Sequence, residues 1–219
     1  MSTGGYCQHR NSISPTAMMR LETALELAHG YLLQLAPVTH RAVIAGSVRR
    51  GLRQVGDIEI VVQPRMIADG LFGEQRPDTE AILAVARRLG EVTKAGDRYI
   101  RVEAPYFRTP GHLETVGVDI YMVHPPAQWG CILAIRTGPA RLGRWAMQCL
   151  ARRGYVHRDG AIWRRTGRHE RSFNGEWREV LEPVEVPDEE TFFRIAGLPC
   201  LPPSRRGTRA AFRPLSEEV

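Results

Sequence analysis

The order of apolar and polar positions predicts alternating helices and strands in the first 125 residues. From Thr16 to Leu35 apolar residues recur at alternating steps of three and four, which places them on one face of an amphipathic helix that Pro37 ends. The apolar spacing is helical again at 82–89. Short apolar or alternating runs predict strands at 41–46, 57–62, 91–94, 98–104 and 116–123, and we expect a loop at 105–115.

The pattern changes after residue 125. Helical spacing predicts helices at 128–136 and 141–152, and short strands are expected near 155–156 and 161–163. A polar loop is expected from there to Glu182, followed by a last short helix at 189–196.

These elements predict an α+β fold with two parts. We expect a first domain at 16–125, with a mixed sheet and flanking helices, and a small α/β C-terminal subdomain at 126–206. The ends of the chain, 1–15 and 207–219, are expected to be flexible tails.

Composition describes an ordinary globular protein, with 43% hydrophobic and 25% charged residues in a chain of 219. No apolar run approaches the roughly 20 residues that cross a bilayer, and the polar N-terminus lacks the apolar core of a signal peptide. We therefore expect a cytoplasmic protein of bacterial or phage type, without a membrane partner. The four cysteines are scattered and have no zinc-ligand spacing, so free thiols are expected.

Three acidic residues stand where strands are otherwise apolar. Asp57 and Glu59 flank Ile58, so strand geometry puts both carboxylates on one face, and Asp119 stands alone between Val118 and Ile120. Adjacent carboxylates repel each other unless a cation lies between them. If the two strands are neighbours, the three side chains converge into the ligand set of a two-metal site. Taken alone, the pair fits a solvent-facing strand edge equally well.

A glycine and a serine precede this pair by ten residues. Gly46 allows backbone N–H groups to approach an anion, Ser47 adds a hydroxyl donor, and Arg50 supplies a charge-assisted hydrogen bond. An anion site followed at this spacing by metal-binding carboxylates is what phosphoryl transfer requires, and it favours the catalytic interpretation of Asp57 and Glu59.

The segments 45–51 and 55–62 resemble the signature of the polymerase beta-type (family X) DNA polymerases, which belong to the nucleotidyltransferase superfamily. Further segments that match the family in order and spacing are 118–120, 134–138, 154–155 and 197–203. The resemblance extends from about residue 16 to 206 and implies a minimal form, made of a palm domain and a C-terminal subdomain. We expect no lyase activity, because Lys94 is the only lysine and lies in the palm hairpin.

The resemblance also implies roles for individual residues. Asp57 and Glu59 would bind two Mg²⁺ ions, with Mn²⁺ as a possible substitute, and Asp119 would bind the ion that activates the primer 3′-hydroxyl. That hydroxyl would attack the α-phosphorus of a nucleoside triphosphate and release pyrophosphate. The implied nucleotide-binding residues are Gly46, Ser47, Arg50 and Gly56 at the phosphates, Thr137 and Gly138 at the sugar, and Arg144 and Met147 at the nascent base pair.

The chain departs from the family pattern at three places. Glu59 replaces the usual second aspartate, and Ile135 and Arg136 replace the aromatic pair that screens the sugar 2′-position. Gly143 and Met147 stand where many members have residues that reach into the minor groove. These departures leave the choice between dNTP and NTP open and imply weak base-pair checking.

Basic residues accumulate in the second half. Residues 136–171 contain ten arginines against Asp159 and Glu170, in a chain whose formal net charge is +6. An excess of this kind favours contact with a phosphate backbone. The arginines we assign to DNA binding are Arg136, Arg141, Arg152, Arg153, Arg164 and Arg165.

The leading hypothesis is a monomeric DNA-directed DNA polymerase that adds dNMP to a primer 3′-hydroxyl. Its partners would be a primer-template or gapped DNA and a nucleoside triphosphate, in short gap filling during DNA repair or phage replication. The first alternative is a nucleotidyltransferase that works without a template, or on RNA or a small molecule. The second is a nucleic-acid-binding protein whose transferase site has decayed.

Overall fold

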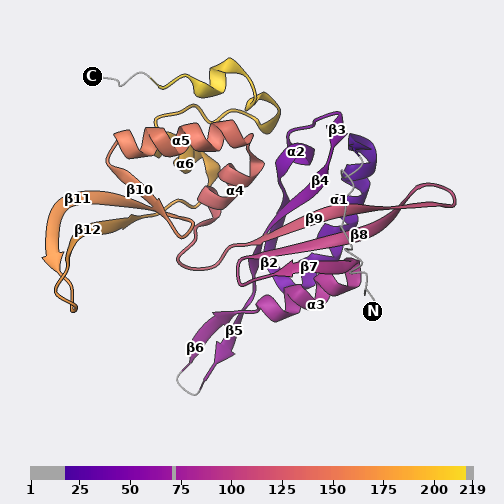
Figure 1. Cartoon of the computed structure of the whole chain (residues 1–219), viewed down its shortest axis with the longest axis horizontal. Helices are drawn as coiled ribbons and strands as arrows, with labels where there is room; N and C mark the ends of the chain where they lie inside the picture. The colour runs from indigo at the N-terminus through magenta and orange to yellow at the C-terminus, as the bar shows by residue number, and fades with distance from the viewer. Residues whose placement is uncertain (1–17, 71–72, 216–219) are drawn as a thin grey trace, which may run out of the picture.

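The computed structural model describes residues 18–70 and 73–215, and it confirms the α+β fold with a mixed central sheet and flanking helices. The sheet has five strands in the order β2-β4-β9-β8-β7 (Figure 1). These strands are β2 (Thr39–Ile44), β4 (Asp57–Pro64), β7 (Glu91–Ala95), β8 (Tyr99–Thr109) and β9 (His112–Met122). β4 and β9 run parallel, whereas the other neighbouring pairs are antiparallel.

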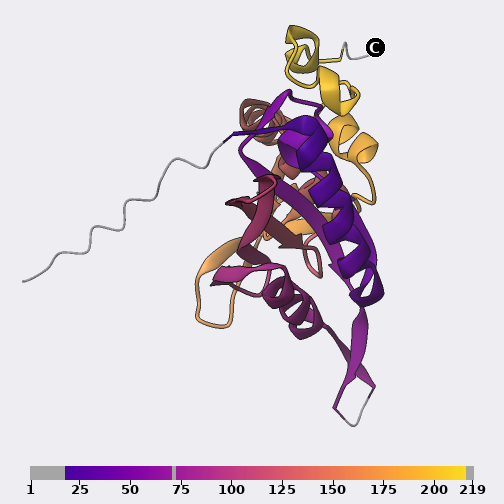
Figure 2. The same ribbon diagram turned by 90° about the vertical axis from the view of Figure 1, so that its right-hand side faces the viewer.

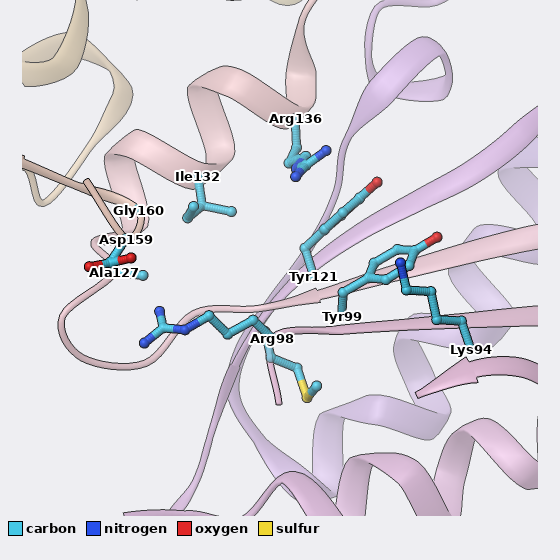
Figure 3. A pocket seen from close by; sticks show the side chains of 10 residues that line it. Lys94, Arg98, Tyr99, Tyr121, Ala127, Ile132, Arg136, Asp159 and Gly160 are labelled. Atoms are coloured by element: carbon cyan, nitrogen blue, oxygen red, sulfur yellow. The ribbon is translucent and has the colours of Figure 1, made fainter. Parts of the chain in front are cut away.

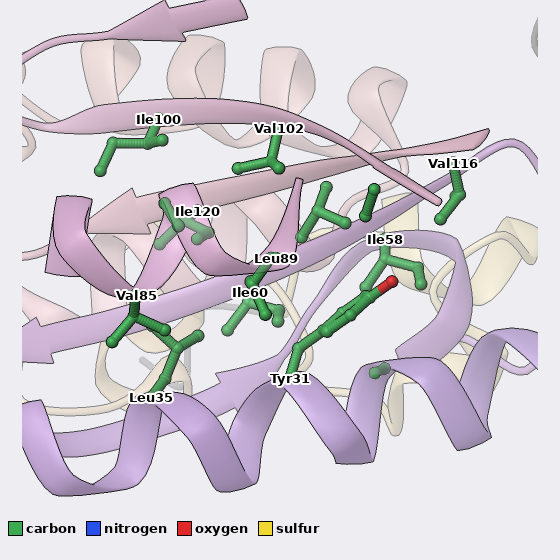
Figure 4. Packing of buried hydrophobic residues seen from close by; sticks show 14 of the residues in the cluster. Tyr31, Leu35, Ile58, Ile60, Val85, Leu89, Ile100, Val102, Val116 and Ile120 are labelled. Carbon is green, nitrogen blue, oxygen red and sulfur yellow. The ribbon is translucent and has the colours of Figure 1, made fainter. Parts of the chain in front are cut away.

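Two helices cover one face of this sheet, α1 (Leu21–Leu35) and α3 (Thr79–Leu89). Ile58 and Ile60 of β4 pack with Ile120 of β9 and with apolar side chains of both helices (Figure 4). Alternation along β4 and β9 gives this result, because every second residue is apolar and turns toward the helices. The residues between them, including the three carboxylates, therefore lie on the opposite face.

The helix predicted from residue 16 begins at Leu21, because Met19 and Arg20 form a short strand, β1, paired with β3 (Gln54–Val55). Asp78 caps the N-terminus of α3 by accepting a hydrogen bond from the backbone N–H of Ala81, at 3.1 Å. Figure 2 shows α1 lying along the sheet, with the small hairpin of β5 (Met66–Asp69) and β6 (Glu74–Pro77) projecting beyond it. That hairpin was not predicted.

The C-terminal part has a hydrophobic cluster of its own, which includes Cys131, Leu150 and Phe192. Its helices are α4 (Trp129–Thr137), α5 (Ala140–Arg152) and α6 (Glu189–Ile195). Its strands β10 (Tyr155–Arg158), β11 (Ala161–Arg171) and β12 (Trp177–Val184) form an antiparallel sheet. The β11–β12 hairpin projects away from the helices (Figure 1).

Two expected loops are hairpins instead. Residues 105–115 continue β8 into β9, with Pro105 opposite Thr115. β7 pairs with β8 only as far as Glu103, so Pro105 sits on an edge where its missing N–H is tolerated. The expected polar loop up to Glu182 is mostly β11 and β12. Charged cross-strand pairs line these strands, so no apolar alternation marks them in the sequence.

The expected C-terminal tail also differs. Residues 203–205 and 209–212 form the 3₁₀ turns η2 and η3, Ala211 is buried, and the N–H of Leu215 donates to the carbonyl of Gly197 at 2.8 Å. Residues 207–215 are therefore packed on the C-terminal part. The expected tail at 1–15 and the last residues, 216–219, lie outside the described residues.

Within the described ranges, no helix is both long enough and apolar enough to cross a membrane.

Candidate active site

The three predicted carboxylates lie together on the face of the central sheet opposite α1 and α3. The parallel register of β4 and β9 pairs Glu59 with Asp119 and Asp57 with Gly117. Asp119 is buried, with 6% of its surface exposed, and Asp57 and Glu59 are half-buried. Adjacent strands are about 4.8 Å apart, so the three side chains are close neighbours.

The electrostatics of this cluster are those of crowded negative charge. The pKa of Glu59 rises to about 7, because burial disfavours its charged form and Asp57 and Asp119 repel it, against the opposing effect of Arg136 and Arg50. The pKa of Asp57 is also raised, mainly by burial and to a smaller extent by the negative charge of Asp119. A divalent cation would relieve both effects, and carboxylate oxygens are the ligands that Mg²⁺ and Mn²⁺ prefer.

Asp119 is held by two donors from β8. Its Oδ1 accepts a hydrogen bond from the Tyr99 hydroxyl at 2.7 Å and another from Arg101 Nη1 at 2.9 Å. In the part of the chain that the structure describes, no three acidic, histidine or cysteine side chains are already gathered as a metal-ligand set. The donor types and their shared face therefore fit a cation, but a complete ligand set is not preassembled.

Gly46 begins α2 (Gly46–Arg49), the short helix that follows β2 and packs against β4. Its φ of 61° lies in the left-handed region, and a Cβ at this position would be only 1.9 Å from Glu59 Oε2. The N–H of Ala45 donates to the carbonyl of Glu59 at 2.7 Å. Glycine is therefore required where this turn meets the carboxylate.

Ser47 and Arg50 carry the polar groups of the same turn. The Ser47 hydroxyl is buried and has no hydrogen-bond partner among the described residues. An unsatisfied buried hydroxyl is costly, which is consistent with a ligand that completes it. Arg50 Nη1 donates to the carbonyl of Thr137 at 2.5 Å and lies near Glu59 and Asp57. This contact brings together the predicted residues Arg50, Thr137 and Gly138.

A buried ion network joins α2 to the C-terminal part, and sequence reasoning missed it. Arg49 donates to Thr137 Oγ1 at 2.5 Å and to Glu189 Oε2 at 2.6 Å, while Arg206 donates to Glu189 Oε1 at 2.5 Å. Burial tends to raise the pKa of Glu189, but the hydrogen bonds from Arg206 and Arg49 bring it below its ordinary value. The pair Arg49–Glu189 spans 140 positions, so no local pattern indicates it.

A cavity of about 490 Å³ opens between the carboxylates and α5. It gathers several predicted nucleotide-binding residues with others that the sequence did not assign. Its lining residues are Arg50, Glu59, Ile135, Arg136, Gly138, Ala140, Gly143, Arg144, Met147 and His157. Gly56 is not among them, and lies instead at the β3–β4 junction beside Met18.

A second cavity, of about 510 Å³, lies on the other side of Arg136 (Figure 3). The rings of Tyr99 and Tyr121 stack there with centroids 5.1 Å apart, and the guanidinium of Arg136 lies 3.9 Å above Tyr121. Lys94 and Arg98 also line this cavity. Arg136, predicted at a DNA surface, thus borders both cavities and Glu59.

The other arginines predicted to bind DNA have varied surroundings. Arg141 contacts the carbonyl of Gly207 and the Phe212 ring, Arg152 lies over Trp145, and the Arg153 side chain lies beside Gly197. On the β11–β12 hairpin, Arg164 pairs with Glu182 at 2.5 Å and Arg165 with Glu179 at 2.8 Å. Both glutamates come after the basic segment 136–171, so the local charge excess is smaller than that segment suggests.

Comparison with known proteins finds similarity in structure but not in sequence. No protein-family profile and no curated protein matches the sequence. Among solved structures, the chain is similar to the crystal structure of Leishmania infantum polymerase beta in a ternary P/T complex, with a TM-score of 0.67 and 17% identity. The match covers 89% of this chain and 78% of that one. The chain therefore has a polymerase beta-like nucleotidyltransferase fold.

Proposed function

We propose that this protein is a nucleotidyltransferase, and more specifically a DNA-directed DNA polymerase that adds dNMP to a primer 3′-hydroxyl. The observation that carries the proposal is the position of Asp57, Glu59 and Asp119, on one sheet face beside a cavity lined by Arg50 and Gly138. Residues 16–125 would hold the catalytic groups, and residues 126–206 would bind nucleotide and DNA.

Asp57, Glu59 and Asp119 would hold two Mg²⁺ ions. Bound there, the ions would polarise the phosphate, favour the ionised 3′-hydroxyl and offset the charge that develops on the leaving pyrophosphate. The ions would also offset the repulsion among the three carboxylates, which together with burial raises the pKa of Glu59 to about 7.

The other residues of the site would bind and orient the triphosphate. The Ser47 hydroxyl is a buried donor without a partner in the described chain, and Arg50 offers a guanidinium beside the carboxylates. A Cβ at Gly138 would lie 3.0 Å from Arg50 Nη1, so glycine leaves room for the guanidinium that donates to the Thr137 carbonyl. The Thr137–Gly138 turn would lie against the sugar. Arg144 and Met147 line the end of the cavity on α5, where the base would lie.

The β11–β12 hairpin is the second element that supports a nucleic-acid partner. Arg164, Arg165 and Arg168 are exposed on β11, and the aromatic rings of Phe173 and Trp177 are exposed at its tip. Exposed arginines bind phosphates and exposed aromatic rings stack on bases. The polymerase beta structure that this chain is similar to is itself in a ternary P/T complex.

The decisive experiment is primer extension on a one-nucleotide-gapped duplex, with Mg²⁺ or Mn²⁺ and each dNTP or NTP separately. We expect incorporation of the complementary nucleotide only, and its loss in Asp119→Ala. Asp69→Ala is the matched control, since Asp69 is exposed on the β5–β6 hairpin.

Other outcomes would change the proposal. Addition without a template would support terminal transfer, and equal use of NTPs would show that Ile135 does not exclude a 2′-hydroxyl. Absence of addition to any nucleic acid, with intact metal binding, would favour a small-molecule acceptor. Absence of both metal binding and addition would indicate a decayed site.

A further inference from the structure

We propose that Arg101 is a positioning residue for Asp119: its guanidinium, admitted over the bare backbone of Gly117, fixes one carboxylate oxygen and leaves the other for a metal ion. This inference rests on the proposed function, because it assigns Asp119 to metal binding. It assigns a role to a residue of β8 and to a glycine of β9 beside carboxylates that come from β4 and β9.

The strand register places Arg101 where it can act. β8 and β9 are antiparallel, with Arg101 directly opposite Asp119 and Glu103 directly opposite Gly117. Opposed side chains share a face and have Cβ atoms about 5 Å apart. The Arg101 side chain is longer than this gap, so its guanidinium bends along the sheet toward the Glu103–Gly117 pair.

Two hydrogen bonds hold the guanidinium in that position. Nε donates to Glu103 Oε1 at 3.1 Å, and Nη1 donates to Asp119 Oδ1 at 2.9 Å. A planar fork that joins two carboxylates on different strands fixes its own orientation, which an ammonium group cannot do. Arg101 therefore links Asp119 to a carboxylate outside the cluster.

Gly117 leaves the space that this geometry needs. A Cβ at position 117 would lie 1.9 Å from Arg101 Nη2 and 2.3 Å from its Cζ. Gly117 lies within a regular strand and has no left-handed φ, so conformation alone does not demand glycine. The Arg101 guanidinium passes over position 117, and this close approach is the physical reason why position 117 has no side chain.

Both donors to Asp119 approach the same oxygen. Oδ1 accepts from Arg101 and from the Tyr99 hydroxyl, and the Tyr99 ring is itself stacked on Tyr121. A carboxylate held twice through one oxygen is fixed in rotation, and its Oδ2 remains to bind a cation. Donors behind a metal ligand orient it in this way, and their loss typically lowers metal affinity about 10–100-fold.

The opposite role is that Arg101 takes the place of a cation and competes with it. If Arg101 positions Asp119, its removal should weaken metal binding. If Arg101 competes with the cation, its removal should strengthen metal binding. Two observations favour positioning. Arg101 is hydrogen-bonded to Glu103 where it passes over Gly117. It donates to the same Asp119 oxygen that accepts from Tyr99.

Binding of Mn²⁺ to the full chain, followed by electron paramagnetic resonance of the free ion, tests the proposal without catalysis. We expect Arg101→Ala to weaken Mn²⁺ binding about tenfold or more, and Arg101→Lys to recover part of the loss. Gly117→Ala should weaken binding similarly, because the new methyl displaces the end of a flexible side chain. Combined with Arg101→Ala, Gly117→Ala should add nothing.

Thermal unfolding in EDTA shows whether each variant folds, and Gly117→Ala carries the test if Arg101→Ala does not fold. In primer extension, the Mg²⁺ concentration for half-maximal rate should rise more than kcat falls. Unchanged or tighter Mn²⁺ binding in both Arg101→Ala and Gly117→Ala would overturn the proposal. Mn²⁺ binding that is equal in wild type and Asp119→Ala would instead refute the metal site, and with it the proposed function.

Discussion

The two faces of the central sheet are built from the same strands but are organised by different forces. On one face Ile58, Ile60 and Ile120 are fully buried against α1 and α3, and burial of apolar surface stabilises the fold. On the other face, one residue away along each strand, Glu59 and Asp119 lie beside each other and their charges repel. Within β4, one residue thus stabilises the fold and the next supplies a carboxylate to the candidate site.

This separation implies that the chemical face is maintained at a cost to stability. A carboxylate whose pKa is raised by burial and by like charges is less stable in the folded protein than in water. Substitutions at neighbouring positions on the two faces should therefore change stability and activity independently.

The largest effect is expected on the charged face. Asp57→Asn keeps the shape of the side chain but removes a charge that would hold two metal ions, so incorporation should fall about 10³-fold or more. Its free energy of unfolding in EDTA should equal or exceed that of wild type, because a repelled carboxylate has been neutralised. Single-turnover primer extension and urea unfolding measure the two quantities. Loss of stability in step with activity would contradict the separation of the faces.

The next effect is expected one residue away, on the apolar face. Ile58→Ala should lower the free energy of unfolding by about 2–5 kcal/mol, because Ile58 is completely buried and the deletion leaves a cavity. At a temperature where the variant is folded, its Mg²⁺-dependent incorporation should stay within a few-fold of wild type. Leu33→Ala, at an exposed position of α1, is the control and should change neither quantity appreciably. A collapse of activity in folded Ile58→Ala would show that the faces are coupled.

Alternation made both faces of the sheet predictable from the sequence. The period of two at 57–62 and around Asp119 indicated which side chains turn away from the core, and the Gly46–Ser47 turn indicated where an anion would bind. The close approach of Gly46 to Glu59 was not predicted, although both residues had been assigned to the site.

Contacts that depend on register or on distant segments were not predictable. Arg101 opposes Asp119 through the register of the β8–β9 hairpin, a pairing that the expected strands and loop did not specify. Glu189 meets Arg49 although the two residues are 140 positions apart in the sequence. The start of β11 was predicted near 161–163, but the rest of β11 and β12 was missed, because charged residues rather than apolar ones face each other across them.

A smaller effect, dependent on pH, is expected at Glu59. Its pKa is about 7 in the folded chain against an ordinary value of 4.5, so folding favours the protonated form. In EDTA, this group's contribution to stability is greatest below pH 4.5 and is lost as the pH rises to about 7. Glu59→Gln should remove that slope and be more stable than wild type at pH 8. Urea unfolding between pH 4 and 8 measures this, with Glu74→Gln on exposed β6 as the control. An unchanged slope in Glu59→Gln would assign it to another group.

The smallest effect is expected in the β11–β12 hairpin, which has no buried face beyond its base and therefore tests the comparison from outside. Exposed ion pairs contribute about 0–1 kcal/mol, so Arg165→Ala should leave stability nearly unchanged although it removes the pair with Glu179. If Arg165 binds a phosphate, the slope of log affinity for gapped DNA against log salt should fall by about one. Arg76→Ala, which removes an exposed pair with Asp69 on the β5–β6 hairpin, is the matched control. Equal weakening by both variants would mean that the protein's overall positive charge binds DNA, whereas an effect of Arg165 alone would make the hairpin a binding element without a core.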